Sequence, residues 1–299
     1  MPTPAEAVFR AHAAQKTRLA AAAQRGVGAA WDRLGSWNRS DVARFVGLVA
    51  PLVHAAQLQA AALTEAYLLQ LARVVTGKTV TARGLSGQDV AGPAVRNGTP
   101  PEAVYERPFV EHWKALADGH SWSEAWDMGR QRAVSAAHTD VRLAGRQAAQ
   151  NTMLLHEDLD IVGYRRVLVG RSCRFCAAAS TQRYHVEDLM PLHPACNCEV
   201  LPIWATEDPG RIINDDLYRK IRQDDPGGFM GMVLGPHKDR KDWQQFGFVD
   251  EDGNPVDMSD GETRNAIRAA NRDVAVRDHG ELGPTLTSDR HHFSGPDDI

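Results

Sequence analysis

Residues 173–198 read CRFCAAASTQRYHVEDLMPLHPACNC and contain all 4 cysteines of the 299-residue chain. A Cys173-x2-Cys176 pair is followed by His193-Pro-Ala-Cys196-Asn-Cys198, so five soft donors lie within this one segment. Zinc prefers four sulfur or imidazole ligands at tetrahedral angles, and a C-x2-C turn presents two thiolates to the same side. Thiols this close together favour a metal cage over disulfides that would join distant segments. The sequence therefore predicts one structural zinc ion here.

The segment offers one donor more than a tetrahedral zinc ion takes. Cys196 and Cys198 are two residues apart and are expected to point to opposite faces of an extended chain, so both could bind one ion only if the backbone turned between them. The preferred ligands are therefore Cys173, Cys176, His193 and Cys196. Cys198 in place of either member of the second pair is the alternative set. One or two disulfides, or four reduced thiols without metal, are the other readings left open. The surplus of thiols favours a closed structural site, since a catalytic zinc keeps one position for water.

Strand-forming residues flank the cysteine segment. Residues 163–170 read GYRRVLVG and residues 198–204 read CEVLPIW, both rich in β-branched or aromatic residues. They predict a small zinc-clamped β-hairpin unit over residues 163–204. Its own core would be too small to hold its shape without the metal.

Helical patterns fill the first half of the chain. Residues 5–34 are Ala-rich and contain no proline, and a second helical run extends from 41 to about 75, with a kink expected at Pro51. Residues 1–76 therefore predict an Ala-rich helical hairpin. Residues 77–98 are rich in Gly, Thr and Ser and are interpreted as a linker.

Two more helices are expected in a domain over residues 99–223. Thr99-Pro-Pro-Glu102 and Ser121-Trp-Ser-Glu124 are capping sequences that predict helices to about 118 and 156, and residues 215–223 form a short candidate. An apolar stripe at helical spacing predicts a core face: Trp126, Ala133, Ala137, Val141 and Ala144. Residues 224–299 predict a poorly ordered, Gly/Asp-rich acidic tail. The expected fold is mainly α (α+β).

The charge distribution limits the classes of partner. A net charge of -4 excludes a histone-like polycation. Five basic residues nevertheless recur along the first predicted helix and leave non-specific DNA contact open: Arg10, Lys16, Arg18, Arg25 and Arg33. Residues 45–64 carry no charge, but Pro51, His54 and the glutamines favour a buried or oligomer-packed helix over a membrane span, so no membrane partner is expected.

Catalytic signatures are weak. The chain has no G-x-S-x-G elbow, no H-E-x-x-H and no Gly-rich phosphate loop. His185-Val-Glu187 before the last cysteines echoes the zinc deaminase pattern, although the C-x-C spacing departs from it. An HNH-type nuclease using His185 and His193 is the other enzyme alternative. We expect a protein that is not an enzyme.

Several features follow one another in a fixed order: a long helix with a polar run (Asp140, Arg142, Arg146), a strand, C-x2-C, H-P-x-C-x-C and a second strand. In this order the chain resembles the MuF-like minor capsid, or head morphogenesis, proteins of tailed bacteriophages, actinobacteriophage type. The resemblance covers roughly residues 100–205, and Asn197 stands where that family usually has a basic residue. It implies a minor structural protein of the virion, made in the host cytoplasm. Its implied partners are the portal or the major capsid protein, with a role in DNA packaging or delivery. A cellular zinc-ribbon adaptor is the remaining alternative.

Overall fold

The computed structural model describes residues 2–169, 176, 179–180, 183–189, 196–205, 207–214, 274–278, 280, 282 and 284–288. The helices are α1 (Pro4–Trp31), α2 (Arg39–Thr76), α3 (Gly87–Val90), α4 (Pro101–Ala117) and α5 (Trp122–Leu155), with 3-10 turns η1 (Gly92–Val95), η2 (Glu157–Leu159) and η3 (Val186–Asp188). The strands are β1 (Ile161–Val167), β2 (Arg183–Tyr184), β3 (Glu199–Trp204), β4 (Val274–Asp278) and β5 (Pro284–Ser288). The prediction of a mainly helical chain with long N-terminal helices is confirmed.

Local sequence explains where the long helices begin. The side chains of Thr3 and Asn38 accept hydrogen bonds from backbone N–H groups of the first turns of α1 and α2. The predicted capping box of Ser121 and Glu124 is present at the start of α5. The predicted cap at Thr99 is wrong, because α4 begins at Pro101 after Pro100 and has no side-chain cap.

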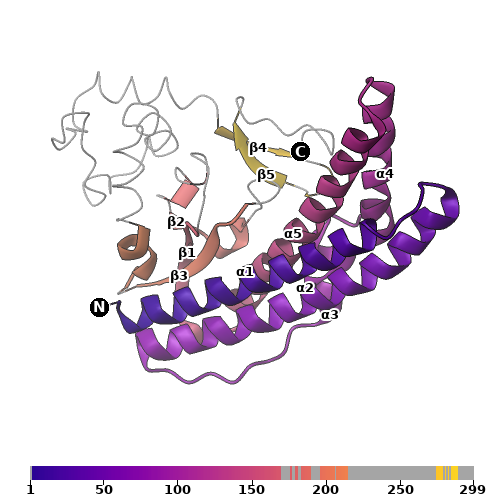
Figure 1. The fold of residues 1–299 in the computed structure, drawn as a ribbon. Helices are drawn as coiled ribbons and strands as arrows, with labels where there is room; N and C mark the ends of the chain where they lie inside the picture. Colours follow the sequence, from indigo (N-terminus) through magenta and orange to yellow (C-terminus); the bar gives the residue numbers. More distant parts are fainter. Residues whose placement is uncertain are drawn as a thin grey trace, which may run out of the picture.

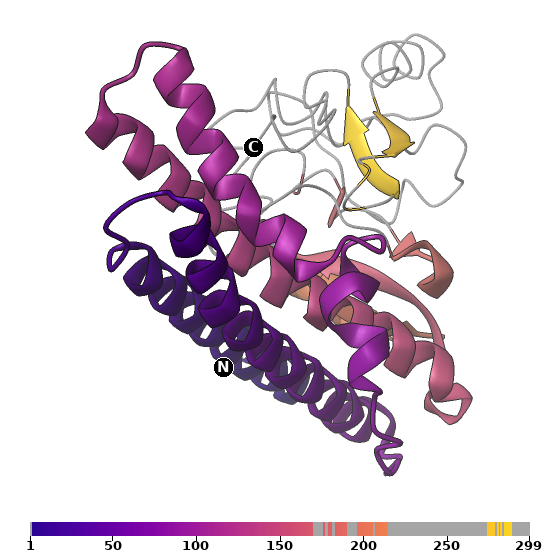
Figure 2. The same cartoon turned by 90° about the vertical axis from the view of Figure 1, so that its right-hand side faces the viewer.

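The four long helices form one bundle (Figures 1 and 2). α1 and α2 lie side by side, α5 contacts both, and α4 packs on α5 and α2. At one end of the bundle the ring of Trp31 packs against those of Phe45 and Phe109. Further along, small side chains allow close approach: Ala20, Ala23, Ala56, Ala60 and Val141. The predicted core stripe on α5 is buried from Ala133 to Ala144, while Trp126 is half-buried.

The segment interpreted as a linker also contributes to this core. Residues 77–98 contain α3 and η1, and Val90, Val95 and Arg96 are buried. Val90 packs with Ala61 and Ala148, one from each of the neighbouring helices α2 and α5. The bundle therefore combines the predicted N-terminal hairpin with the helices of the predicted middle domain.

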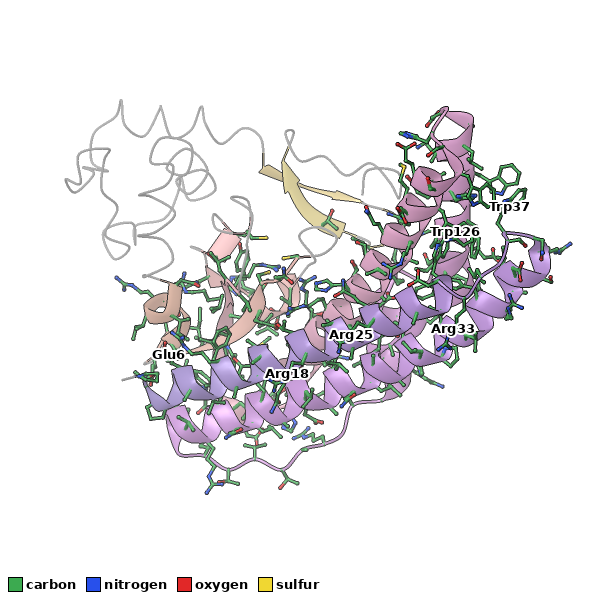
Figure 3. All side chains as sticks on the ribbon, viewed as in Figure 1. Glu6, Arg18, Arg25, Arg33, Trp37 and Trp126 are labelled. Carbon is green, nitrogen blue, oxygen red and sulfur yellow. The ribbon has the colours of Figure 1, made fainter. Side chains whose placement is uncertain are left out.

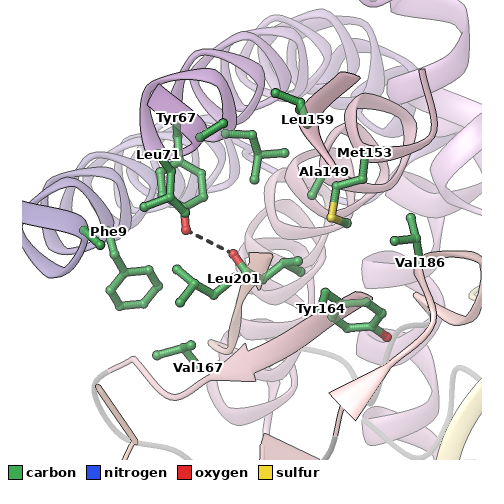
Figure 4. Packing of buried hydrophobic residues seen from close by; sticks show 14 of the residues in the cluster. Phe9, Tyr67, Leu71, Ala149, Met153, Leu159, Tyr164, Val167, Val186 and Leu201 are labelled. Atoms are coloured by element: carbon green, nitrogen blue, oxygen red, sulfur yellow. Dashed lines mark hydrogen bonds between the residues drawn. The ribbon is translucent and has the colours of Figure 1, made fainter. Parts of the chain in front are cut away.

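A small antiparallel sheet of order β2-β1-β3 lies against one end of the bundle. The predicted pairing of the two flanking strands is confirmed, with Arg165 opposite Leu201 and Val167 opposite Glu199. Side chains from α1, α2, α5 and the sheet share one hydrophobic core (Figure 4). The Tyr67 hydroxyl donates to the Val200 carbonyl oxygen at 3.3 Å and ties α2 to β3.

The predicted tail contains a β-hairpin that the sequence interpretation missed. β4 and β5 pair antiparallel, with Val276 opposite Leu286. Asn97 donates to the Gly280 carbonyl oxygen at 2.6 Å, and Leu282 packs with Val95 and Leu143. The predicted helix over 215–223 lies outside the described residues.

Candidate metal centre

Three of the five predicted donors lie together. The Sγ atom of Cys196 is 3.4 Å from that of Cys176 and 3.0 Å from that of Cys198. All three side chains are buried, and none is in a disulfide. Cys173 and His193, the other two predicted donors, lie outside the described residues. The convergence of Cys176 with the C-x-C pair is the part of the predicted site that can be compared with the structure.

The Sγ–Sγ distances match neither a disulfide bond nor a tetrahedral zinc site. A disulfide bond is about 2.0 Å long, and Zn–S bonds of about 2.3 Å at tetrahedral angles separate the sulfurs by roughly 3.8 Å. Among the described residues no group of three or more His, Cys, Asp or Glu side chains is arranged to hold a metal ion. The structure therefore shows a compact thiol cluster, and the zinc ion stays a prediction.

The sulfurs of both members of the C-x-C pair lie on the same side of the chain. Cys198 directly precedes β3, and its Sγ atom is 3.0 Å from that of Cys196. The preference for Cys196 over Cys198 rested on the expectation that their side chains point to opposite faces. That expectation is wrong, because the two sulfurs lie 3.0 Å apart and residues two apart on an extended chain share a face.

Two buried arginines give the thiol cluster a positive surrounding. The Arg166 guanidinium donates to Cys198 Sγ at 3.6 Å. It lies over the rings of Tyr164 and Tyr184, with its central carbon 5.8 Å and 5.4 Å from their centroids. These two rings stack on each other and fix the position of the guanidinium. Arg146 on α5 is also buried and acts on the sulfurs through its charge.

The surroundings favour a thiolate at one cysteine. Hydrogen bonds from the thiols of Cys176 and Cys196, helped by the charges of Arg166 and Arg146, lower the pKa of Cys198 well below its ordinary value. The hydrogen bond with Cys176 would also lower the pKa of Cys196, but the contact with Cys198 and burial raise it. A soft metal ion binds thiolates, so the lowered pKa favours Cys198 as a metal ligand.

The next residue anchors the cluster to the helices. Glu199, the first residue of β3, is buried, and its carboxylate accepts hydrogen bonds from Lys16 Nζ at 2.6 Å and from the Arg142 guanidinium. These two cations lower the pKa of Glu199 despite the opposing effect of burial. His12 Nε2 lies 4.0 Å from the same carboxylate, and the His12 ring stacks on Tyr67. This network was not predicted from the sequence, because no sequence motif connects residues 12–16 with residue 199.

Asn197 adds a second link from the C-x-C pair to α5. Its side-chain oxygen lies 3.1 Å from His138 Nε2 and accepts a hydrogen bond from Arg142 at 3.3 Å. The residue that departs from the family pattern is therefore a structural contact here.

The predicted DNA-contact residues on α1 do not share one environment. Lys16 is buried against Glu199, which excludes it from a surface contact. Arg10 is exposed and pairs with Glu6. Arg18, Arg25 and Arg33 are exposed.

A second buried polar cluster lies between α2, η1, α4 and α5. Arg96 donates to the Asp140 carboxylate at 2.6 Å, and the Tyr105 hydroxyl donates to its other oxygen at 2.5 Å. The adjoining pocket, lined also by His54 and Gln57, has a volume of about 10 Å³. That is room for about one water molecule, so this cluster is suited to holding helices together.

No protein-family model, curated protein or solved structure matches this chain. The resemblance to phage head proteins therefore stays a prediction from the residue pattern of roughly residues 100–205.

Proposed function

We propose that the chain is a minor structural protein of a tailed-phage head. In this proposal it associates with the portal or the major capsid protein, acts in capsid assembly and in DNA packaging or delivery, and carries one structural zinc ion. Its site of action is the virion, and any DNA contact is non-specific. The protein would work by assembly and would not catalyse a reaction.

The observation that supports this proposal best is the convergence of Cys176, Cys196 and Cys198 directly before β3. The thiols follow a long helix and a strand in the order that the phage head proteins share. Cys173 and His193 would complete the donor set around the ion. Zinc would then supply no reaction chemistry and would hold the two arms of the cysteine segment together.

The charges around the cysteines support a thiolate site. The buried guanidinium of Arg166 donates to Cys198 Sγ at 3.6 Å, and the charges of Arg166 and Arg146 both help to lower the pKa of Cys198. Zinc binds cysteine as the thiolate, which is the form that these two cations favour.

The anchoring network supports a structural role. Glu199 ties the cysteine-bearing strand to α1 and α5 through two buried ion pairs. A metal that fixes the cysteine segment would thereby fix the sheet against the bundle. This coupling suits a part that must keep its shape while it is bound by larger partners.

Mass spectrometry of purified virions tests the assignment. The proposal predicts peptides of this chain in the particles in a few copies, together with stoichiometric zinc in the purified protein. Absence from the virion would contradict the head assignment whatever the metal content. Cleavage or deamination of DNA by the purified protein that is lost in His185→Ala would favour the enzyme alternatives, whose key side chain is exposed at the start of η3.

A further inference from the structure

The outward side of α2 exposes apolar side chains. Leu48, Leu52 and Leu58 are 57%, 37% and 37% exposed. Small or uncharged residues between and after them are also exposed: Pro51, Ala55, Gln59 and Ala62. α2 is the one helix of the described chain that is long and apolar enough to cross a membrane by length and composition. Its other sides pack on α1, α4 and α5, and none of these helices covers this side in the part of the chain that the structure describes.

Contacts on both sides define the borders of this apolar strip. A Cβ atom on Gly26 would lie 2.8 Å from Leu52 Cδ1, which places Leu52 against α1. A Cβ atom on Gly87 would lie 2.9 Å from Leu58 Cδ2, which places Leu58 against the start of α3. The strip therefore runs between α1 and the segment that leads into α3.

The two segments that border the strip carry exposed positive charge. Arg18 and Arg25 are exposed and lie two helical turns apart, on the same side of α1 (Figure 3). Arg83 is exposed in the segment before α3. Residues 7–31, 45–64 and 77–88 contain no Asp or Glu. In the described structure no ion pair joins Arg18, Arg25 or Arg83 to a carboxylate. We call these three arginines and the three leucines the α1–α2 face.

The chemistry of the α1–α2 face selects among partners. The phosphates of a nucleic acid would pair with the arginines, but the leucines would then lie against phosphates and sugars and would gain no apolar contact. A second copy of the same face would bury the leucines against one another, but it would also bring arginines close to arginines, which repel. A membrane surface with anionic headgroups satisfies both, because apolar side chains enter the acyl boundary while arginines reach the phosphates.

We infer that the α1–α2 face binds the surface of an anionic lipid bilayer. Leu48, Leu52 and Leu58 enter the interface, and Arg18, Arg25 and Arg83 contact lipid phosphates on either side. The helices stay folded in the bundle and lie on the membrane without crossing it. This activity goes beyond the proposed role in the phage head and departs from the sequence-based expectation of no membrane partner.

Co-sedimentation of the full-length protein with vesicles tests this inference. We expect binding to vesicles of phosphatidylcholine mixed with phosphatidylglycerol and little binding to phosphatidylcholine alone. The double variant Arg18→Gln/Arg25→Gln is expected to bind about 30-fold more weakly, since each arginine near an anionic surface contributes about a fivefold factor. Leu48→Gln is expected to weaken binding about tenfold or more.

Matched variants outside the face serve as controls. Val110→Gln on α4 changes a residue that is 62% exposed, and Lys114→Gln/Arg211→Gln removes two exposed charges elsewhere. Both are expected to bind like the unaltered protein. Equal binding to both vesicle types, no vesicle binding, or unchanged binding of the Leu48 and arginine variants would overturn the inference. Leu48-dependent self-association without vesicle binding would instead assign the face to a second copy.

Discussion

Lys16 on α1 donates a hydrogen bond of 2.6 Å to the carboxylate of Glu199 on β3, across 183 residues of sequence. Both side chains are almost fully buried, with 4% and 3% of their surface exposed. Arg142 on α5 pairs with the other oxygen of the same carboxylate. One carboxylate next to the C-x-C pair therefore joins the first helix, the last long helix and the sheet.

Replacement of this carboxylate should destabilise the whole fold. Glu199→Gln leaves Lys16 and Arg142 buried without a counter-charge, and removal of one partner of a buried ion pair costs about 3–5 kcal/mol. Chemical denaturation of the variant measures this loss. Glu157→Gln, at an exposed position, is the control and should change stability by less than about 0.5 kcal/mol. Equal stability of the two variants would contradict the anchoring role.

His12 should make the fold sensitive to mild acid. Burial lowers the pKa of His12 from 6.5 to about 4. Between these values the unfolded chain binds the proton and the folded chain does not, so stability falls as pH falls from 6.5 to about 4. The full loss is roughly 3 kcal/mol. His12→Phe keeps a ring against Tyr67 and should flatten this part of the pH profile. A profile equal to that of the unaltered protein would contradict the assignment.

The pH profile should have a second, more acidic part that belongs to Glu199. Its pKa is lowered by Lys16 and Arg142 against the opposing effect of burial. A carboxylate with a lowered pKa contributes stability above its unfolded pKa and loses it as the pH falls through the folded value. This loss therefore lies below pH 4.5 and should persist in His12→Phe.

Two glycines in helices should respond to alanine in opposite directions. A Cβ atom on Gly129 of α5 would lie 2.8 Å from the Pro108 carbonyl oxygen and 2.8 Å from the Trp31 ring. Gly129→Ala should therefore cost about 1–3 kcal/mol through overpacking. Gly47 of α2 has open space around it, so Gly47→Ala should stabilise by about 0.5–1 kcal/mol. Thermal or urea unfolding distinguishes the two, and a loss at Gly47 equal to that at Gly129 would contradict the packing.

Arg166 should tune metal binding by the thiol cluster. Arg166→Leu removes the charge that helps to lower the pKa of Cys198, so protons compete better and zinc should be released at a higher pH. Zinc affinity measured by competition with a chelating dye should fall about 10–100-fold. Arg39→Leu, at an exposed position on α2, is the control. Unchanged affinity in Arg166→Leu would show that the arginine does not act on the site.

Local signals allowed most of the helical architecture to be predicted from the sequence. The Ser121–Glu124 capping box and the apolar spacing along α5 predicted a long helix and its buried face, and both are observed. The β-branched runs predicted β1 and β3 and their pairing. The hairpin of β4 and β5 was missed, because it lies among Gly, Pro and acidic residues that carry a loop composition.

The non-local part of the candidate site could not be predicted. The sequence pattern named the cysteines, but the partners of the C-x-C pair come from distant elements: Lys16 from α1, and His138 and Arg142 from α5. From the sequence alone, a lysine in an Ala-rich helix is predicted to be exposed. Only the folded structure shows that the Glu199 carboxylate lies beside Lys16. The same lack of long-range information made Lys16 a candidate DNA contact, although it is buried.

X-ray absorption at the zinc edge of the purified full-length protein measures whether the thiol cluster holds zinc. We expect one zinc ion per chain with sulfur ligands at about 2.3 Å, completed either by a fourth sulfur or by one nitrogen at about 2.0–2.1 Å. Cys176→Ser and Cys198→Ser should each reduce the sulfur signal. A protein that folds without bound zinc and keeps its stability in the presence of a chelator would have no structural zinc site.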